Sequence, residues 1–375
     1  MLNALETPAL VLDANKLDRN VARMRTRLAA LNVAFRPHVK TAKSIDVVRG
    51  MITTPQGPIT VSTLKEADYF FAHGITDVLY AVSITPNKLD HIKRLTDAGA
   101  TLTLLLDNAA AAHSVVAHGK AHGIAHRVLI EIDCDGHRSG VQPDAPDLIA
   151  IGQLLHAGGA TLCGVLTHAG DSYNCRGTDA IRAMAEQERS RTVRAAERLR
   201  AAGLPCPIVS VGSTPTALFA EHLDGVTEVR AGVFVFFDLV MAGLNVCRID
   251  DLALSVLTTV IGHQSDKGWI ITDAGWMAMS RDRGTSKHPV DQGYGVVCTL
   301  DGTPIDDLIM TDANQEHGIL AHRHGDRAKT PNLPVGTLLR ILPNHACATG
   351  AQHDRYQVVR GTNAVEAVWT RFSGW

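Results

Sequence analysis

The sequence has no long hydrophobic segment. The longest apolar runs, such as residues 233–237, fall far short of the ~20 residues that a helix needs to span a bilayer. Residues 1–13 show no basic stretch ahead of an apolar one, and Glu6 interrupts the only candidate segment, so we expect no secretory signal. The sequence therefore predicts a cytoplasmic protein that does not have a membrane as its partner.

The sequence also lacks an excess of either charge, and its cysteines show no sign of pairing. The 36 Lys and Arg residues nearly balance the 38 Asp and Glu residues, giving a net charge of -2, which offers no bulk attraction to nucleic acid. The seven cysteines are odd in number and lack any Cys-x-x-Cys spacing. A disulfide framework is therefore not expected, and a reducing compartment fits this cysteine usage.

What the chain does have is a regular alternation of strand-like and helix-like segments. Helical periodicity is clear in residues 17–31 and 181–202. Eight strands that alternate with helices predict an α/β fold with a (β/α)8 barrel, because a doubly wound sheet usually has fewer strands. The charged face of the second helical segment is marked by Glu186, Glu188, Arg189, Arg191 and Arg194. The predicted strands are residues 34–40, 59–63, 77–83, 102–107, 127–133, 162–168, 208–212 and 228–232.

The pattern changes after about Asp250. Strand-like runs follow one another without intervening helices, separated by turns, which indicates a second, mostly β domain. The runs are residues 253–262, 268–272, 295–300 and 337–342. We therefore expect a barrel over residues 1–245, with its first few residues able to join the second domain, and a β domain over residues 246–375.

The first predicted strand ends in a lysine. In a barrel the chemistry gathers at the C-terminal ends of the strands, so Lys40 is expected at the barrel mouth. A lysine amine at that position could form a Schiff base with a carbonyl group. On spacing alone, a solvent-exposed lysine at a strand end is the simpler interpretation.

The residues around Lys40 change this interpretation. Arg36-Pro37-His38-Val39-Lys40-Thr41 resembles the cofactor-lysine motif of the D-threonine aldolase and D-serine dehydratase family, two-domain relatives of alanine racemase. Further motifs follow in family order and cover nearly the whole chain. They are residues 136–141, 167–170, 211–216, 230–234, 273–275, 315–318 and 343–347. The resemblance implies an alanine-racemase-like barrel, a C-terminal mostly β domain, and pyridoxal 5'-phosphate held by Lys40.

Two glycine-containing turns are candidates to bind the cofactor phosphate. Gly212, Ser213 and Thr214 lie in a strand-to-helix turn, where small residues let backbone N–H groups approach a phosphate and hydroxyls add donors. Gly232 follows the last predicted strand, and barrels often bind phosphate with the loops after their last two strands.

Three other residues are expected near the cofactor ring. By resemblance, Arg138 lies beside the ring, and Tyr173 is the nearby aromatic residue with a hydroxyl group. His168 is expected to contact the ring, although a structural role for this histidine is equally open. His38 is interpreted as a core or supporting residue.

His345 and Cys347 are the candidate metal ligands. In an extended segment, side chains at i and i+2 face the same way and can share one ion. An imidazole and a thiolate favour Zn²⁺, and their position matches the family's metal site. We expect a divalent metal, zinc first, with manganese, magnesium and cobalt as the alternatives.

The resemblance implies a dehydratase (ammonia-lyase) that depends on pyridoxal phosphate and a metal. The expected substrates are β-hydroxy-D-amino acids such as D-threo-3-hydroxyaspartate, and the products are a 2-oxo acid and ammonia. Lys40 would abstract the α-proton, and the metal would make the β-hydroxyl a better leaving group. His317 is a candidate base or a brace for the metal ligands. By resemblance the protein is also expected to be a homodimer.

Alternative functions remain open at this point. The same residues could support retro-aldol cleavage to glycine and an aldehyde, but some aldolases of the family carry an aspartate where this chain has Cys347. A non-catalytic carrier of pyridoxal phosphate and an amino-acid racemase are more remote, because neither has a use for the metal pair. Arg281, Arg283 and His317 are candidates to hold a substrate carboxylate.

Overall fold

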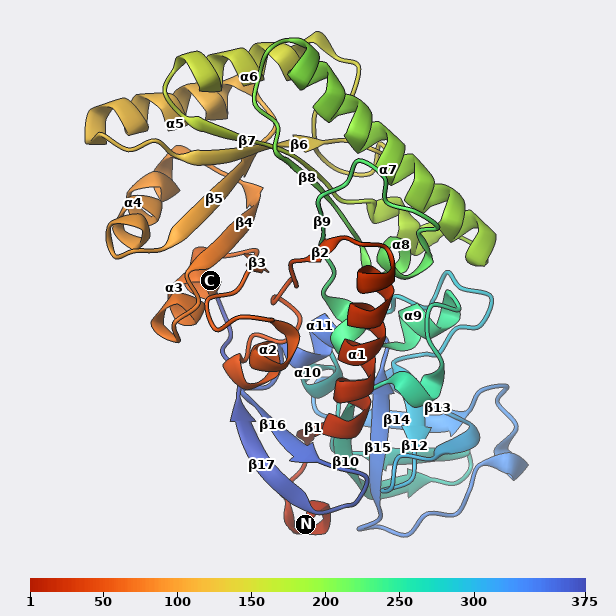
Figure 1. Cartoon of the computed structure of the whole chain (residues 1–375). Helices are drawn as coiled ribbons and strands as arrows, with labels where there is room; N and C mark the ends of the chain where they lie inside the picture. Colours follow the sequence, from red (N-terminus) through yellow and green to blue (C-terminus); the bar gives the residue numbers. More distant parts are fainter. The chain divides into compact units, whose positions relative to one another are not determined.

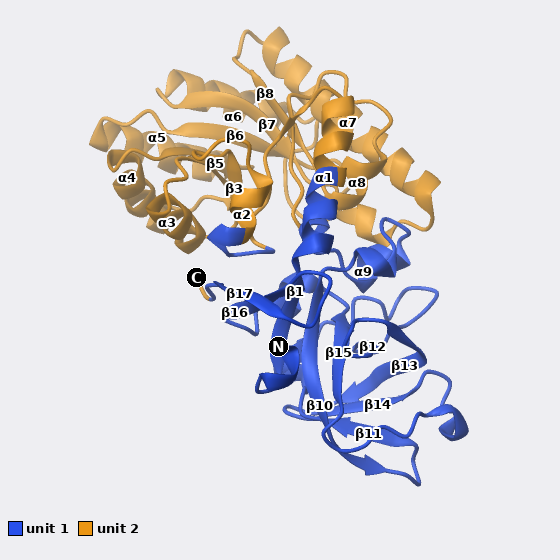
Figure 2. Ribbon diagram, turned by 60° about the horizontal axis from the view of Figure 1, so that its bottom comes forward, with its two compact units in different colours: residues 1–22, 41–46, 233–373 blue, residues 23–40, 47–232, 374–375 orange.

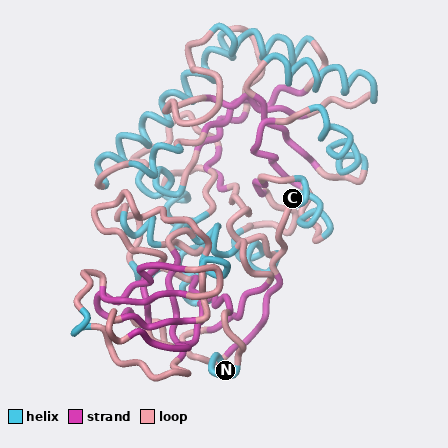
Figure 3. Tube along the Cα trace, turned by 180° about the vertical axis from the view of Figure 1, so that it is seen from behind, coloured by secondary structure: helices cyan, strands magenta, loops and turns pink.

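The structure, a computed structural model, describes residues 1–375 and divides the chain into two compact units (Figure 2). Unit 1 comprises Met1–Ala22, Thr41–Asp46 and Val233–Ser373, and unit 2 comprises Arg23–Lys40, Val47–Gly232 and Gly374–Trp375. Figure 3 shows that helices flank the strands of unit 2, whereas unit 1 consists mainly of strands and loops. The units are described separately below.

Unit 2 contains an eight-stranded parallel sheet in the order β2-β9-β8-β7-β6-β5-β4-β3. A single parallel bridge between His38 and Thr60 connects the two ends of this order. Two backbone hydrogen bonds support the closure, from Val39 N to Thr60 O and from Thr60 N to Pro37 O. The predicted barrel is therefore confirmed. The strands are β2 (Ala34–Phe35), β3 (Ile59–Val61), β4 (Asp77–Ser83), β5 (Thr101–Leu106), β6 (Arg127–Ile132), β7 (Thr161–Thr167), β8 (Ile208–Val211) and β9 (Glu228–Val229).

Helices alternate with these strands, and α4 to α7 lie on the outer side of the sheet (Figure 1). Local sequence sets several helix ends: Asn108 caps α5 by accepting a hydrogen bond from Ala111 N, and Gly123 ends α5 in the left-handed conformation. The helices are α1 (Ala14–Ala30), α2 (Ile45–Met51), α3 (Leu64–Ala72), α4 (Leu89–Asp97), α5 (Ala109–His122), α6 (Pro146–Ala157), α7 (Thr178–Ala201) and α8 (Thr214–Phe219). The first half of α1, up to Ala22, and the first two residues of α2, Ile45 and Asp46, are grouped with unit 1.

Unit 1 is built on a nine-stranded sheet in the order β11-β14-β13-β12-β15-β10-β1-β16-β17. An additional pairing between β11 and β10 closes six of these strands into a ring, and β1 joins β16 and β17 to the open side of β10. The strands are β1 (Ala9–Asp13), β10 (Leu254–Gln264), β11 (Trp269–Thr272), β12 (Gly295–Cys298), β13 (Pro304–Ala313), β14 (Gly318–His322), β15 (Leu338–Pro343), β16 (Arg355–Val359) and β17 (Val365–Thr370).

Several expectations from the sequence differ from the structure in detail. The first and last barrel strands are two residues long rather than seven and five, although hydrogen bonds from Arg36 N to Val229 O and from His38 N to Ala231 O continue between the two segments. Unit 1 also contains three short helices, α9 (Leu239–Gly243), α10 (Trp276–Met279) and α11 (Ala346–Gly350). All seven cysteines are free thiols, as expected. None of the helices combines the length and the apolar character that a membrane-spanning helix requires.

Candidate active site

Lys40 lies at the C-terminal end of the first barrel strand, in an exposed turn directly after the His38 bridge. Its backbone N–H donates to His38 Nδ1 at 3.4 Å, and His38 Nε2 lies 3.2 Å from the Oγ of Ser62, which directly follows β3. Burial lowers the pKa of His38 well below its usual value, and Lys40 adds to the shift. The neutral His38 ring therefore supports the turn that presents Lys40.

His168 follows β7 in the same barrel, and its Nδ1 donates to the carbonyl oxygen of Gly212 at 2.9 Å. Burial lowers the pKa of His168 to about 3, although the hydrogen bond to Gly212 opposes the shift, while Lys40, Arg138 and Arg230 reinforce it. The Tyr173 ring is 6.3 Å from the His168 ring, centroid to centroid. A neutral imidazole, a phenol and three cationic side chains thus gather at these strand ends of unit 2.

Arg138 is largely exposed in the loop after β6, with 57% of its side chain accessible. Its Nη2 donates to Glu131 Oε1 at 3.3 Å, and the Glu131 side chain is only 5% accessible. Glu131 thereby anchors one side of the guanidinium. The remaining N–H groups of Arg138 are free to donate to another group.

The turn after β8 contains Gly212, Ser213 and Thr214, all buried. Ser213 caps α8 in a reciprocal arrangement with Thr216, and its hydroxyl also lies 2.9 Å from Ser172 Oγ. Gly232, after β9, has a backbone N–H with no hydrogen-bond partner in the chain. Hydroxyl and backbone donors are therefore present on two neighbouring strand ends.

Glu188 on α7 is a residue whose role the sequence analysis missed. The sequence places it on the charged face of this helix, but in the structure the residue is only 2% exposed. One oxygen, Oε1, accepts hydrogen bonds from Ala169 N at 3.0 Å and Gly212 N at 2.9 Å. Burial raises the pKa of Glu188, although these hydrogen bonds oppose the shift. A single side chain thus joins the loop that carries His168 to the turn that carries Ser213.

In unit 1, His345 precedes α11 and Cys347 lies within its first turn. The expected extended segment is therefore wrong, but the two side chains still meet through a hydrogen bond. His345 Nδ1 donates to Asp282 Oδ2 at 2.6 Å. Because an ionised carboxylate can only accept, the proton is on Nδ1, so Nε2 is the nitrogen that could bind an ion.

The charges around His345 suit a metal ligand set. Burial disfavours the protonated imidazole, but the Cys347 thiolate and the Asp282 carboxylate outweigh burial and raise the pKa of His345 to about 11. Hydrogen bonding to His345 in turn lowers the pKa of Asp282. These anionic groups stabilise a positive charge at His345, which a bound metal ion would supply in place of the proton.

Two further contacts position this pair. Asp238, 1% exposed, accepts hydrogen bonds from Met241 N and Ala346 N, both at 3.0 Å, and so joins the starts of α9 and α11. Thr41 Oγ1 lies 3.2 Å from Cys347 Sγ. Thr41 follows Lys40 directly in the chain. The roles of Asp238, Asp282 and Thr41 could not be predicted, because their partners are remote in the sequence.

His317 lies in an exposed turn between β13 and β14, and its side chain makes no hydrogen bond with His345 or Cys347. The two arginines considered as carboxylate ligands have other contacts. Arg281 stacks over Trp276, with its guanidinium carbon 5.2 Å from the ring centroid. Arg283 pairs with Asp291 at 2.8 Å.

Comparison with known proteins accounts for both parts of the chain. Residues 12–240 match the family model of the alanine racemase N-terminal domain, and residues 253–359 match that of a putative serine dehydratase domain. The chain is 56% identical, over 100% of its length and 99% of the relative's, to D-threo-3-hydroxyaspartate dehydratase of Delftia sp. strain HT23. The chain belongs to the D-threonine aldolase and D-serine dehydratase family of pyridoxal-phosphate enzymes.

Solved structures of this family have the same fold. The structure of the Delftia dehydratase matches with a TM-score of 0.97 at 57% identity and covers 100% of this chain and 99% of that one. D-threonine aldolase from Filomicrobium marinum matches with a TM-score of 0.83 at 26% identity, over 98% of this chain and 96% of that one. The predicted fold, an alanine-racemase-like barrel with a β domain, is confirmed.

Among the family relatives, both elimination and cleavage are represented. A 3-hydroxy-D-aspartate aldolase of Paracoccus denitrificans is 28% identical over 97% of this chain and 91% of its own length. Solved variants of D-threo-3-hydroxyaspartate dehydratase replace a histidine and a cysteine two positions apart by alanine, and the cysteine variant is in the metal-free form. His345 and Cys347 have the same spacing in this chain.

Proposed function

We propose that this protein is a pyridoxal-phosphate- and metal-dependent dehydratase of β-hydroxy-D-amino acids, with D-threo-3-hydroxyaspartate as its substrate and oxaloacetate and ammonia as its products. The observation that carries the proposal is the full-length 56% identity to D-threo-3-hydroxyaspartate dehydratase. The His345–Cys347 pair, oriented by Asp282, also supports the proposal, because these two side chains could bind the metal that the reaction requires.

The residues of unit 2 fit pyridoxal phosphate. Lys40 offers an exposed amine, and Ser213, Thr214 and the unpartnered N–H of Gly232 offer donors to a phosphate. Burial keeps the His168 ring neutral, while its hydrogen bond to the Gly212 carbonyl fixes the ring's orientation, so the imidazole and Tyr173 suit contact with an aromatic ring. Arg138, anchored by Glu131, would place a fixed cation near the ring's polar atoms.

The residues of unit 1 fit a divalent metal. The Nε2 atom of His345 and the thiolate of Cys347 are a nitrogen and a sulfur ligand, which favour Zn²⁺ over Mg²⁺ and Mn²⁺. Asp282 orients the imidazole by a hydrogen bond, as carboxylates do in many metal sites. The Thr41 hydroxyl, 3.2 Å from Cys347 Sγ, would stabilise the thiolate by donating a hydrogen bond to it. Two protein ligands leave positions open for water and a substrate oxygen.

When bound, the two groups supply an electron sink and a Lewis acid. Within that chemistry the free amine of Lys40 takes the proton from the α-carbon and is the principal acid–base group. Hydrogen bonds hold Arg138 to Glu131 and His168 to Gly212, so both side chains would meet the cofactor in fixed orientations. His317 is exposed and forms no hydrogen bond with His345. We therefore propose it only as an auxiliary base, which would act when a substrate lies beside it.

Retro-aldol cleavage is the second candidate, because aldolases acting on D-amino acids occur among the 28% identical relatives. The cysteine at position 347 favours elimination, since D-threo-3-hydroxyaspartate dehydratase also has a cysteine two positions after a histidine, and its solved Cys-to-Ala variant is in the metal-free form. The homodimer and the cytoplasmic location expected from the sequence stay predictions.

A product assay with D-threo-3-hydroxyaspartate tests the proposed function. We expect ammonia and oxaloacetate from the wild-type protein, and only traces of glycine. His345→Ala and Cys347→Ala should each lower ammonia release by at least roughly 100-fold, because even supporting residues of metal sites change activity by 10–100-fold, while the visible absorbance of bound cofactor persists.

Lys40→Ala is the matched control, because it should abolish both the visible absorbance and the release of ammonia. Glycine as the main product would favour the aldolase. Full activity of both metal-pair variants would rule out the proposed role of the metal.

A further inference from the structure

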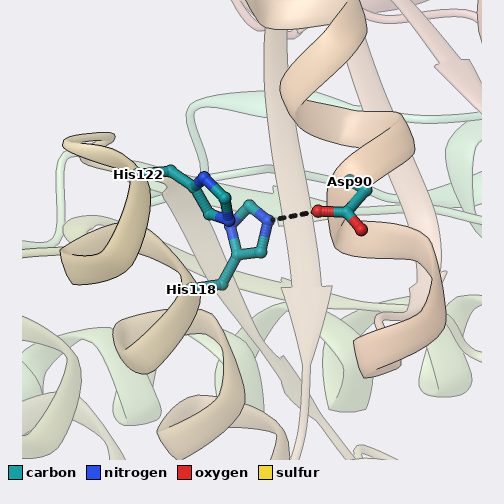
Figure 4. A group of neighbouring side chains, drawn as sticks. All are labelled: Asp90, His118 and His122. Atoms are coloured by element: carbon teal, nitrogen blue, oxygen red, sulfur yellow. Dashed lines mark hydrogen bonds and ion pairs between the residues drawn. The ribbon is translucent and has the colours of Figure 1, made fainter.

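A second group of metal-ligand side chains lies in unit 2, between the outer helices α4 and α5. Asp90 lies in the first turn of α4, and His118 and His122 lie four residues apart near the end of α5 (Figure 4). Residues at i and i+4 face the same side of a helix. Their spacing in the sequence therefore puts both imidazoles on the side of α5 that faces Asp90.

The ligand atoms of these three residues converge. His118 Nε2 and Asp90 Oδ1 are 3.2 Å apart, and the rings of His118 and His122 are 4.4 Å apart, centroid to centroid. One ligand atom from each residue lies within 4.8 Å of the other two. Bonds of ~2.0–2.1 Å to a tetrahedral zinc place ligand atoms roughly 3.4 Å apart, so the three ligand atoms are already near the separation that such an ion needs.

A third histidine fixes the orientation of His118. His126 is buried, with 4% exposure, and its Nε2 lies 2.9 Å from His118 Nδ1. Its backbone is held at the start of β6, where His126 O accepts from Thr161 N at 2.8 Å. An ion on His118 Nε2 would leave the proton on Nδ1, directed at His126. Such a contact to the second ring nitrogen is typical of histidines that bind metals.

Without an ion, the cluster contributes little to stability. The Asp90 side chain is 89% accessible, and exposed ion pairs are weak because water screens them. Two neighbouring imidazoles that face a carboxylate would instead gain from a shared cation. Nitrogen and carboxylate ligands suit zinc, nickel or copper better than magnesium or calcium.

We propose that Asp90, His118 and His122 bind a divalent transition-metal ion that links α4 to α5. Three protein ligands leave one coordination position for water. The ion would stabilise this part of the barrel wall, and it is a different ion from the one assigned to His345 and Cys347 in unit 1. The site is therefore independent of the proposed catalytic chemistry.

Zinc titration of the full-length protein with its cofactor tests this proposal. The His345→Ala/Cys347→Ala double variant serves as the background, so that the other metal pair does not contribute. Calorimetry with ZnCl₂ should give one ion per chain, and zinc should raise the Tm. Adding His122→Ala, or in a separate variant Asp90→Asn, should remove both effects, whereas adding His113→Ala, an exposed histidine elsewhere on α5, should preserve them.

The same zinc titrations can also contradict the proposed metal site. If the background variant binds no zinc, or if zinc binds equally well after both His122→Ala and Asp90→Asn, the proposed site does not exist. Circular dichroism checks that these exposed substitutions leave the fold intact. Wild-type protein carrying only His122→Ala should keep its full dehydratase activity, and a loss of activity would contradict the independence of the two ions.

Discussion

At the scale of single residues, the buried carboxylate of Glu188 depends most on its hydrogen-bond partners. Its Oε1 accepts from two backbone N–H groups, of Ala169 and Gly212, in a site that is 2% exposed. Both donors belong to segments that carry proposed cofactor contacts. A buried carboxylate is costly unless its hydrogen bonds are complete, so we interpret it as a positioning residue for these two loops.

Glu188→Ala should therefore destabilise the protein and weaken cofactor binding. Two buried N–H groups would lose their acceptor, at about 1–3 kcal/mol each, so the free energy of unfolding should fall by about 2–6 kcal/mol. Urea denaturation measures this change, and titration of the cofactor-free protein with pyridoxal phosphate measures the affinity.

Glu188→Gln is the matched control for this prediction. Its amide oxygen can still accept from both N–H groups, and its amide nitrogen can donate to Thr216, which already bonds to Glu188. It should stay close to wild type in both measurements. Equal behaviour of the alanine and glutamine variants would show that the two hydrogen bonds do not position the loops.

At the scale of secondary structure elements, the ends of β8 and β9 are packed too closely for a side chain between them. Gly212 has a φ of +144°, and a Cβ on it would lie 1.9 Å from the Arg230 carbonyl oxygen. Arg230 is buried at 4% exposure and donates to Ser210 Oγ at 2.7 Å. The backbone therefore cannot move away without breaking a buried contact, and the turn requires glycine.

Gly212→Ala should lower stability far more than a glycine substitution that is only strained. Gly177 also has a positive φ, +84°, but a Cβ there meets nothing within 4 Å. Gly177→Ala should cost only the about 1–3 kcal/mol of backbone strain, whereas Gly212→Ala adds a steric clash and should also weaken cofactor binding. Thermal unfolding of the two variants makes the comparison, and equal losses of Tm would contradict it.

At the scale of the whole molecule, the N-terminal segment holds the sheet of unit 1 together. β1 pairs antiparallel with β10 and parallel with β16, so it is an inner strand. Leu10, Val11 and Leu12 are at most 1% exposed. Each such side chain contributes about 1.5–3 kcal/mol by burial, and together they approach the total stability of an average domain.

Deletion of residues 1–13 should therefore prevent cooperative folding of unit 1. β16 and β17 would lose their only connection to the rest of the sheet. We expect an insoluble protein, or one whose calorimetric trace lacks a transition. Deletion of residues 374–375, where Trp375 is 94% exposed, is the control and should leave the Tm unchanged. A wild-type Tm after the longer deletion would contradict the role given to β1.

Local patterns in the sequence were sufficient for the barrel and for the family. Strand and helix periodicity depends on neighbouring residues, so the eight barrel strands and the change to β structure after about Asp250 could be read directly. The motifs around Lys40 and His345 are also contiguous, which made the resemblance specific. The extended conformation predicted for residues 345–347 was nevertheless wrong. Residues 346–350 form α11, whose start is held by the distant Asp238, since its carboxylate accepts a hydrogen bond from Ala346 N.

Only the tertiary structure decided which distant residues support the site. Asp282 reaches His345 across 63 positions, and Asp238 reaches Ala346 across 108. Glu188 has the spacing of a surface residue, yet the loops after β7 and β8 cover it. Such contacts leave no periodic trace in the sequence, because they arise when segments far apart are brought together by the packing of the sheet. The sequence by itself determined the elements and the family, and the packing determined the hydrogen bonds that orient the proposed ligands.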